Sequence, residues 1–197
     1  MEWTWTETGT LALQLAMGIS LAACAGLRAF LPLLIVGAAG RMDVIPLSGS
    51  FEWLESTPAL SVFGVAVVME LLGDKFPGVD HFLDIVQTGA KPVVGTILVA
   101  SVVTELSPLQ ATVLGILLGG SAAGAVHLVK AQARLLSTAT TAGFANPVVS
   151  TGEDIGAGLG AVAAIFIPVA ALILFVIAIV ATVLAMRHLR EGSGLTF

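Results

Sequence analysis

The chain has 197 residues, of which 57% are hydrophobic and 11% are charged, and its formal net charge is −5. A soluble protein of this size could not hide so much apolar surface, so the composition predicts a protein of the lipid bilayer. The length indicates one membrane domain over residues 1–197. The sequence has no basic face for nucleic acid, and we set that class of function aside.

The first apolar run covers residues 10–39 and is long enough to cross a hydrocarbon core of ~30 Å. Arg28 lies near its middle, where a charge costs ~2.5–3.5 kcal/mol on insertion scales. Either the side chain snorkels to the membrane interface, or it faces the helix bundle and pairs with an acidic residue. Pro32 predicts a kink that frees a backbone carbonyl close to Arg28.

The scarce charge of the chain is concentrated between residues 70 and 84. Acidic residues at four-residue spacing share one helical face, as Asp80 and Asp84 do. Carboxylates that converge on a small volume must share a cation or a proton. Hard divalent cations prefer oxygen ligands, so a divalent cation is the one cofactor this segment suggests. The candidate ligands are Glu70, Asp74, Asp80 and Asp84, and Lys75 lies in the same segment as a candidate of the polar site.

A polar connection precedes the second apolar run, and a further apolar run follows the acidic segment. Residues 40–57 form a connection in which Phe51, Trp53 and Leu54 suit a short piece on the membrane surface, and Thr57 before a proline suggests a helix N-cap. Residues 85–105 are long enough to span if they form one helix. We favour a helix broken at residues 89–92 over a re-entrant pair of half-helices.

The fourth apolar run begins after Pro108 and carries glycines at positions 115, 119, 120 and 124, a spacing that predicts close helix packing. Its end places His127, Lys130 and Arg134 on one helical face. These basic residues either anchor the helix at the interface or contribute to a polar site.

The hydroxyl-rich stretch that follows has Asn146 at its centre, next to a proline, and the pair predicts a turn. Ser150 or Thr151 is then expected to cap the next helix. Glu153 and Asp154 are either first-turn acids or members of the polar site.

The last run, residues 155–186, is longer than one span needs, and a proline at position 168 kinks or divides it. The basic residues at its end favour a cytoplasmic C-terminus. The two halves of the chain, residues 9–105 and 108–190, share a plan of a basic helix, a proline-broken acidic segment and an apolar run. Broken helices at matching positions of two halves are typical of transporters. The fold class is therefore an all-α polytopic membrane protein with about five to six transmembrane or broken helices.

Residues 18–32, the segment Glu70–Asp84, Lys130 with Arg134, and the segment Asn146–Asp154 together resemble a bacterial integral-membrane family labelled domain of unknown function 4126. This resemblance covers nearly the whole chain; it implies a bacterial cytoplasmic membrane and no activity. The letters Glu-Leu-Leu-Gly-Asp-Lys are also similar to the Glu-x-Gly-Asp-Lys-Thr motif of calcium/manganese–proton exchangers. Here there is one residue too many before the glycine, phenylalanine replaces the hydroxyl residue, and no second copy exists.

These patterns favour a small membrane transporter or channel that is cation- or proton-coupled. One alternative is a structural or assembly protein with static buried ion pairs; another is a binder of an anion or phospholipid head. No H-E-x-x-H or G-x-S-x-G motif is present, so we do not expect an enzyme. The expected partners are lipid, an ion or small molecule, and a second copy through the glycine-rich faces. The candidate site residues are Arg28, Glu70, Asp74, Lys75, Asp80, Asp84, Lys130, Arg134, Asn146, Glu153 and Asp154.

Overall fold

The computed structural model describes residues 5–73, 77–142 and 144–193, and side chains over 9–73, 87–142 and 144–188. Across these residues the chain consists of helices and connections without a strand, which confirms the all-α class. The elements in chain order are α1 (Trp5–Leu27), α2 (Phe30–Arg41), the 3₁₀-helix η1 (Gly49–Glu55), α3 (Thr57–Gly73), α4 (Pro77–Val102), α5 (Pro108–Leu114), the π-helix η2 (Gly115–Gly120), α6 (Ser121–Thr141), α7 (Asn146–Phe166) and α8 (Pro168–Ser193).

Several of these helices match the dimensions of a bilayer. Within the described residues, four segments are long and apolar enough to cross it, and they are Gly9–Leu27, Pro108–Thr141, Asn146–Phe166 and Pro168–His188. The pair η1 and α3, bent by 62°, adds a fifth if the two helices count as one span. The chain is therefore a polytopic helical membrane protein, as its apolar runs predict.

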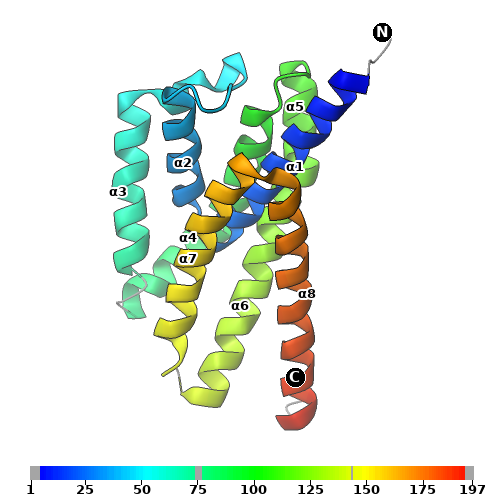
Figure 1. Ribbon diagram of the computed structural model, residues 1–197. Coiled ribbons are helices and arrows are strands. Elements are labelled where there is room, and N and C mark those ends of the chain that lie inside the picture. The colour runs from blue at the N-terminus through cyan, green and yellow to red at the C-terminus, as the bar shows by residue number, and fades with distance from the viewer. Residues whose placement is uncertain (1–4, 74–76, 143, 194–197) are drawn as a thin grey trace.

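The first apolar run forms two helices with a complete break between them. α1 ends at Leu27 and α2 begins at Phe30. Pro32 explains part of this break, because a continuous helix would need its missing N–H to bond the carbonyl of Arg28. Because α2 begins at Phe30, Pro32 lies in its first turn, where backbone N–H groups make no intrahelical hydrogen bond. The missing N–H of the proline therefore costs α2 nothing. In Figure 1, α2 turns back toward the end of the molecule at which α1 begins.

The remaining helices run alternately between the two ends of the molecule (Figure 1). α3 and α4 descend and return, and α5, η2 and α6 form one path to the far end. α7 comes back, α8 descends again, and the two termini lie at opposite ends. The predicted division of the last apolar run is observed, because α7 ends at Phe166 and α8 begins at Pro168.

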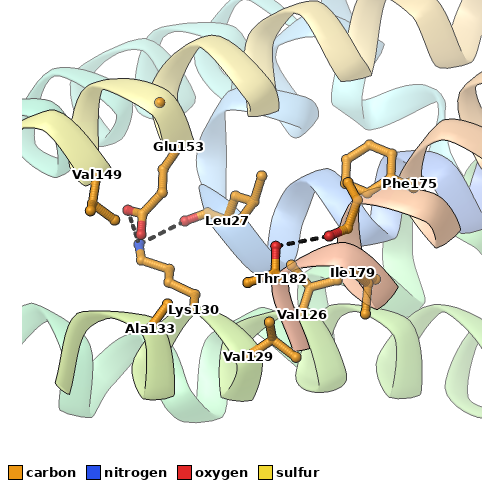
Figure 2. Close-up of a pocket in the computed structure, with 12 residues that line it drawn as sticks. Leu27, Val126, Val129, Lys130, Ala133, Val149, Glu153, Phe175, Ile179 and Thr182 are labelled. Atoms are coloured by element: carbon orange, nitrogen blue, oxygen red, sulfur yellow. Dashed lines mark hydrogen bonds and ion pairs between the residues drawn. The ribbon is translucent and has the colours of Figure 1, made fainter. Parts of the chain in front are cut away.

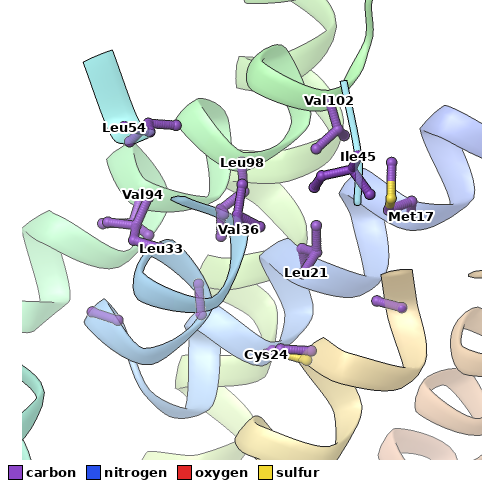
Figure 3. Close-up of a cluster of buried hydrophobic side chains, with 14 of the residues drawn as sticks. Met17, Leu21, Cys24, Leu33, Val36, Ile45, Leu54, Val94, Leu98 and Val102 are labelled. Carbon is purple, nitrogen blue, oxygen red and sulfur yellow. The ribbon is translucent and has the colours of Figure 1, made fainter. Parts of the chain in front are cut away.

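The main hydrophobic core lies where α1, α2, α4 and η1 meet (Figure 3). Leu21 of α1 and Val36 of α2 are completely buried, as is Leu98 of α4. Leu54 of η1 is also completely buried, whereas its neighbour Trp53 is 49% exposed. The connection before α3 therefore covers the core as well as lying at the surface of the molecule.

Glycines allow two helix crossings to be very close. A Cβ atom on Gly119 of η2 would collide with the carbonyl oxygen of Gly95 in α4, and the reverse also holds. A Cβ on Gly26 of α1 would lie 2.5 Å from the Cβ of Val126 in α6. The predicted close packing of the glycine stripe is thus used inside the chain, and assembly through these faces stays a prediction.

Three local predictions are wrong. α4 continues through Pro92 instead of breaking at residues 89–92, and η2 packs against this stretch, where a Cβ on Gly120 would lie 3.2 Å from the Pro92 carbonyl oxygen. A proline is tolerated inside a membrane helix where a neighbouring helix packs against it. α7 begins at Asn146 rather than after Ser150, since proline suits a first helical turn. The residue that caps α3 is Ser56, whose Oγ accepts the amide of Ala59 at 3.3 Å.

Candidate functional site

The C-terminal end of α1 is held by two lysines from other helices. The carbonyl oxygen of Leu27 lies 3.0 Å from Nζ of Lys130 in α6 and 3.5 Å from Nζ of Lys91 in α4. Lys91 is completely buried and Lys130 is 5% exposed. A helix C-terminus carries unpaired carbonyls and partial negative charge, so the two ammonium groups complement it.

The N-terminal end of α2 is held by a carboxylate. Glu70 of α3 accepts hydrogen bonds from the amide of Ala29 at 2.8 Å and from the amide of Phe30 at 3.3 Å. The residue at the N-cap position is alanine, which offers no side-chain acceptor of its own. Glu70, only 2% exposed, therefore supplies the cap from a different helix.

Arg28 lies in the break itself and faces the bundle. Its Nη2 donates to Ser150 Oγ at 2.9 Å, and its Nη1 donates to the carbonyl oxygen of Glu70 at 3.4 Å. Its Nε is 2.5 Å from Oδ1 of Asp154 in α7, an ion pair that is not aligned as a hydrogen bond. With 1% exposure, Arg28 does not snorkel to an interface.

A second ion-pair group joins α6 to α7. Arg134 donates to both oxygens of Glu153, from Nε at 3.3 Å and from Nη2 at 2.9 Å. Lys130 Nζ lies 3.1 Å from the same carboxylate, and Figure 2 shows it between Glu153 and the Leu27 carbonyl. Because α7 begins at Asn146, Glu153 lies in its second turn, and the expectation that it is a first-turn acid is wrong.

Sequence reasoning left Lys91 out of the site and gave His127 no role of its own. Lys91 Nζ lies 3.1 Å from Nδ1 of His127, and Nε2 of that ring lies 3.1 Å from Oγ1 of Thr88. Lys91 carried a signal, because a lysine in the middle of a helix long enough to span is as unusual as Arg28. The partners of Lys91 could not be predicted from the sequence, because Leu27 is 64 positions away along the chain.

Other candidates lie apart or outside the described part of the chain. Asn146 donates to Thr138 Oγ1 at 3.0 Å and so joins the ends of α6 and α7. Asp74 and Lys75 fall outside the described residues, as do the side chains of Asp80 and Asp84. Among the described residues there is no group of three or more His, Cys, Asp or Glu side chains that could hold a metal ion.

A pocket of about 290 Å³ adjoins the ion-pair group (Figure 2). It is bounded by the end of α1 at Leu27, by α6 at Val126 and Val129, by α7 at Val149 and by α8 at Phe175. Lys130 and Glu153 supply charged groups in its wall. The pocket is therefore apolar over most of its lining and polar where it meets the site.

Fold and site together define a polytopic helical membrane protein with a buried group of acidic and basic side chains around a broken helix pair. The chain belongs to the family described as Domain of unknown function (DUF4126), whose match covers residues 15–188. No curated protein and no solved structure matches the chain. Nothing in these comparisons supports the similarity to calcium/manganese–proton exchangers. The division into halves at residues 9–105 and 108–190 stays a prediction.

Proposed function

We propose that this chain is a small membrane transporter or channel in which the break between α1 and α2 forms the centre of an ion- or proton-handling site. The observation that carries this proposal is the way the break is held. Glu70 from α3 and the two lysines from α4 and α6 complement its helix ends, and Arg28 within it reaches α7.

Discontinuous helices whose ends meet ionisable groups are typical of secondary transporters. Ionisable residues inside a membrane span are expensive, and they commonly mark ion or proton pathways. A small protein could have used apolar residues at these positions at less cost. A site assembled from several helices also offers a way to couple a change of charge to a helix movement.

The contact between Lys91 and His127 supports coupling to protons. A lysine ammonium can only donate, so Nδ1 of His127 must accept, and the remaining ring N–H on Nε2 donates to Thr88. When His127 takes up a proton, both ring nitrogens become donors and the contact with Lys91 is lost. Lys91 also holds the Leu27 carbonyl, so this protonation would act on the end of α1.

A divalent cation is less well supported within the described residues. The oxygens of Glu70 accept backbone amides of α2, and those of Glu153 accept from Arg134 and Lys130. These carboxylates are engaged separately rather than gathered around one point. A divalent cation needs several oxygen ligands around one point. A proton needs only one titratable group with hydrogen-bond partners, so a proton fits this arrangement better than a divalent cation.

The structural alternative has an observation in its favour, since each charged group of the site that the structure describes has a partner. On that account the ion pairs join helices and carry nothing. It predicts that no ion stabilises the purified protein and that changing both members of a pair restores whatever changing one member loses.

Reconstitution into liposomes tests the proposal. Fluxes of protons, monovalent and divalent cations, and anions would be measured for the wild type, for Glu70→Gln and Asp84→Asn, and for Arg28→Gln and Lys130→Gln. We expect a proton-dependent flux that the Glu70 and Arg28 variants lower at least ~10-fold, the size of one lost charged hydrogen bond. Wild-type liposomes that pass none of these ions faster than empty ones would contradict the proposal.

A further inference from the structure

Asp154 is more exposed than the other charged groups of the site that the structure describes. Its side chain is 32% exposed, whereas that of its partner Arg28 is 1% exposed and that of the neighbouring Glu153 is 8% exposed. Oδ1 of Asp154 is buried against Arg28, so the exposure belongs to the rest of the side chain, which includes Oδ2. The carboxyl group is thus held on one side and open on the other.

The depth of Asp154 in the membrane decides what meets its open side. α7 is one of the candidate spans, and Asp154 is eight positions after its first residue, Asn146. At ~1.5 Å per residue this places Asp154 about 12 Å into a helix of about 31 Å. A carboxylate against hydrocarbon is costly at such a depth, and acidic residues of membrane spans face the bundle or water. Since the bundle leaves Asp154 partly open, we expect water on that side.

A polar face of α7 leads from Asp154 back to the start of the helix. Ser150 and Asn146 precede Asp154 by four and eight positions, so the three side chains form a stripe along one face. Asn146 Nδ2 donates to Thr138 Oγ1 at 3.0 Å, and Ser150 Oγ accepts from Arg28. The stripe therefore offers a polar group at each turn between the start of α7 and the ion pair.

Two atoms near the place where α6 ends and α7 begins are buried without a hydrogen-bond partner in the described part of the chain. They are Oδ1 of Asn146 and Oγ of Ser137, which is one residue before Thr138 on α6. Buried polar atoms almost always have a partner, and where the protein supplies none a bound water molecule is the usual one. These two atoms therefore point to water at the start of the stripe.

We propose that water reaches Asp154 along this face of α7, from the side of the membrane at which α6 ends. Figure 1 shows that end of α6 opposite the N-terminus of the chain, with the start of α7 close to it. Asn146 and Ser137 bind water at the entrance, and Ser150 lies halfway to the ion pair. The water route does not depend on transport, whereas its use by protons rests on the function proposed above.

Carboxyl chemistry on the wild-type chain in phosphatidylcholine nanodiscs tests the route without any variant. A water-soluble carbodiimide with glycine methyl ester modifies carboxyl groups that water reaches, and dicyclohexylcarbodiimide modifies those that face lipid. By mass spectrometry, we expect the water-soluble reagent to modify Asp154 and the exposed Glu52, and to modify the ion-paired Glu153 at least ~10-fold less than Asp154. Modification of Asp154 by dicyclohexylcarbodiimide alone, or by neither reagent, would overturn the proposal.

Cysteine labelling with a cationic, membrane-impermeant methanethiosulfonate is the second test. Ser150→Cys places a thiol on the polar face, and the matched control Thr151→Cys places one at the next position, which is exposed on another face. We expect Ser150→Cys to react at least ~10-fold faster. In intact cells it should react from the same side of the membrane as Ala139→Cys near the end of α6. Equal rates at positions 150 and 151, or reaction at 150 and 139 from opposite sides, would overturn the route.

Proton flux through liposomes separates this proposal from the proposed function. If protons use the route, attaching the cationic reagent to Ser150→Cys should lower the flux at least ~10-fold relative to the unreacted variant. A protein whose Asp154 and position 150 are both modified from water, but whose wild type moves no protons, would support the water route and refute the proposed function.

Discussion

Glu70 is the residue that we expect to contribute most to stability at the break between α1 and α2. It accepts two backbone amides at the start of α2, in a place that is closed to water. Glu70→Ala leaves both amides unpaired, and we expect a loss of about 1–3 kcal/mol for each unpaired group. Glu70→Gln keeps one acceptor oxygen, so it should lose less. Thermal unfolding of the purified variants in detergent measures both.

The matched control is Glu52→Gln, because Glu52 lies on the exposed side of η1. It should change the free energy of unfolding by no more than about 0.5 kcal/mol, as surface substitutions usually do. If Glu70→Ala and Glu52→Gln are equally stable, Glu70 does not cap α2.

His127 gives the site a dependence on pH whose sign follows from hydrogen bonding. Lys91 of α4 lies 3.1 Å from its Nδ1, and Lys130 follows three positions further along α6. Neutral His127 accepts from Lys91, so its contribution to stability is present at the higher pH and is lost as the pH falls and the ring is protonated. His127→Gln keeps an acceptor but takes up no proton, and it should flatten the dependence of the unfolding midpoint on pH.

The comparison variant is His188→Gln at the exposed end of α8, which should keep the dependence of the wild type. Unfolding midpoints would be followed between about pH 5 and 8, where histidine titrates. A wild type whose midpoint does not fall with pH, or a His127 variant with an unchanged slope, would refute the assignment.

Among the described glycines, Gly95 of α4 and Gly119 of η2 leave the least room for a Cβ atom. Gly119→Ala would push a methyl group into the Gly95 carbonyl of α4, and overpacking of this kind costs about 1–3 kcal/mol. Gly64→Ala in α3 meets nothing within 4 Å and should gain about 0.5–1 kcal/mol from helix propensity. The unfolding midpoint should therefore fall for Gly119→Ala and rise for Gly64→Ala. A Gly119 variant as stable as the Gly64 variant would show that the crossing is not tight.

Some of these elements could be predicted from sequence and others could not. Long apolar runs and small-residue spacing depend on local composition, so the membrane helices and the glycine crossing were accessible. The position of Arg28 in mid-run indicated a buried charge. Its partners were not readable, because Ser150 and Asp154 are brought to it by the packing of α7, which no spacing along one helix encodes.

Prolines show the same limit. Pro32 coincides with a complete break, whereas α4 continues through Pro92. The difference lies in the surroundings, since the ends of the helices at the break find Glu70 and two lysines as partners, while Pro92 is held against the backbone of η2. Neither environment is visible in the residues next to the proline.

For the whole molecule, the arrangement of the helices sets which segments face which side of the membrane. η1, drawn in cyan in Figure 1, lies at the end where the N-terminus is found, and α6 ends at the opposite side. Ser50 in η1 and Ala139 near the end of α6 are both exposed, so Ser50→Cys and Ala139→Cys should react with an impermeant maleimide from opposite faces. The native Cys24 is completely buried and gives little background.

If the C-terminus is cytoplasmic, as we predicted from the basic residues at the end of α8, position 139 will be protected in intact cells and position 50 will react. The reverse result would give the molecule the opposite orientation and leave the fold unchanged. Reaction of both positions from one face would contradict the arrangement of the helices.

The central claim is that the charges around the α1/α2 break take part in ion or proton movement and do more than join helices. The most direct test is proton flux through liposomes that contain Arg28→Gln/Asp154→Asn, in which both members of the ion pair between the break and α7 are made neutral. We expect this double variant to unfold within about 1 kcal/mol of the wild type, because neither charge of this pair is left buried without its partner, and to have lost proton flux. A double variant that folds and carries protons at the wild-type rate would contradict the claim and favour static ion pairs.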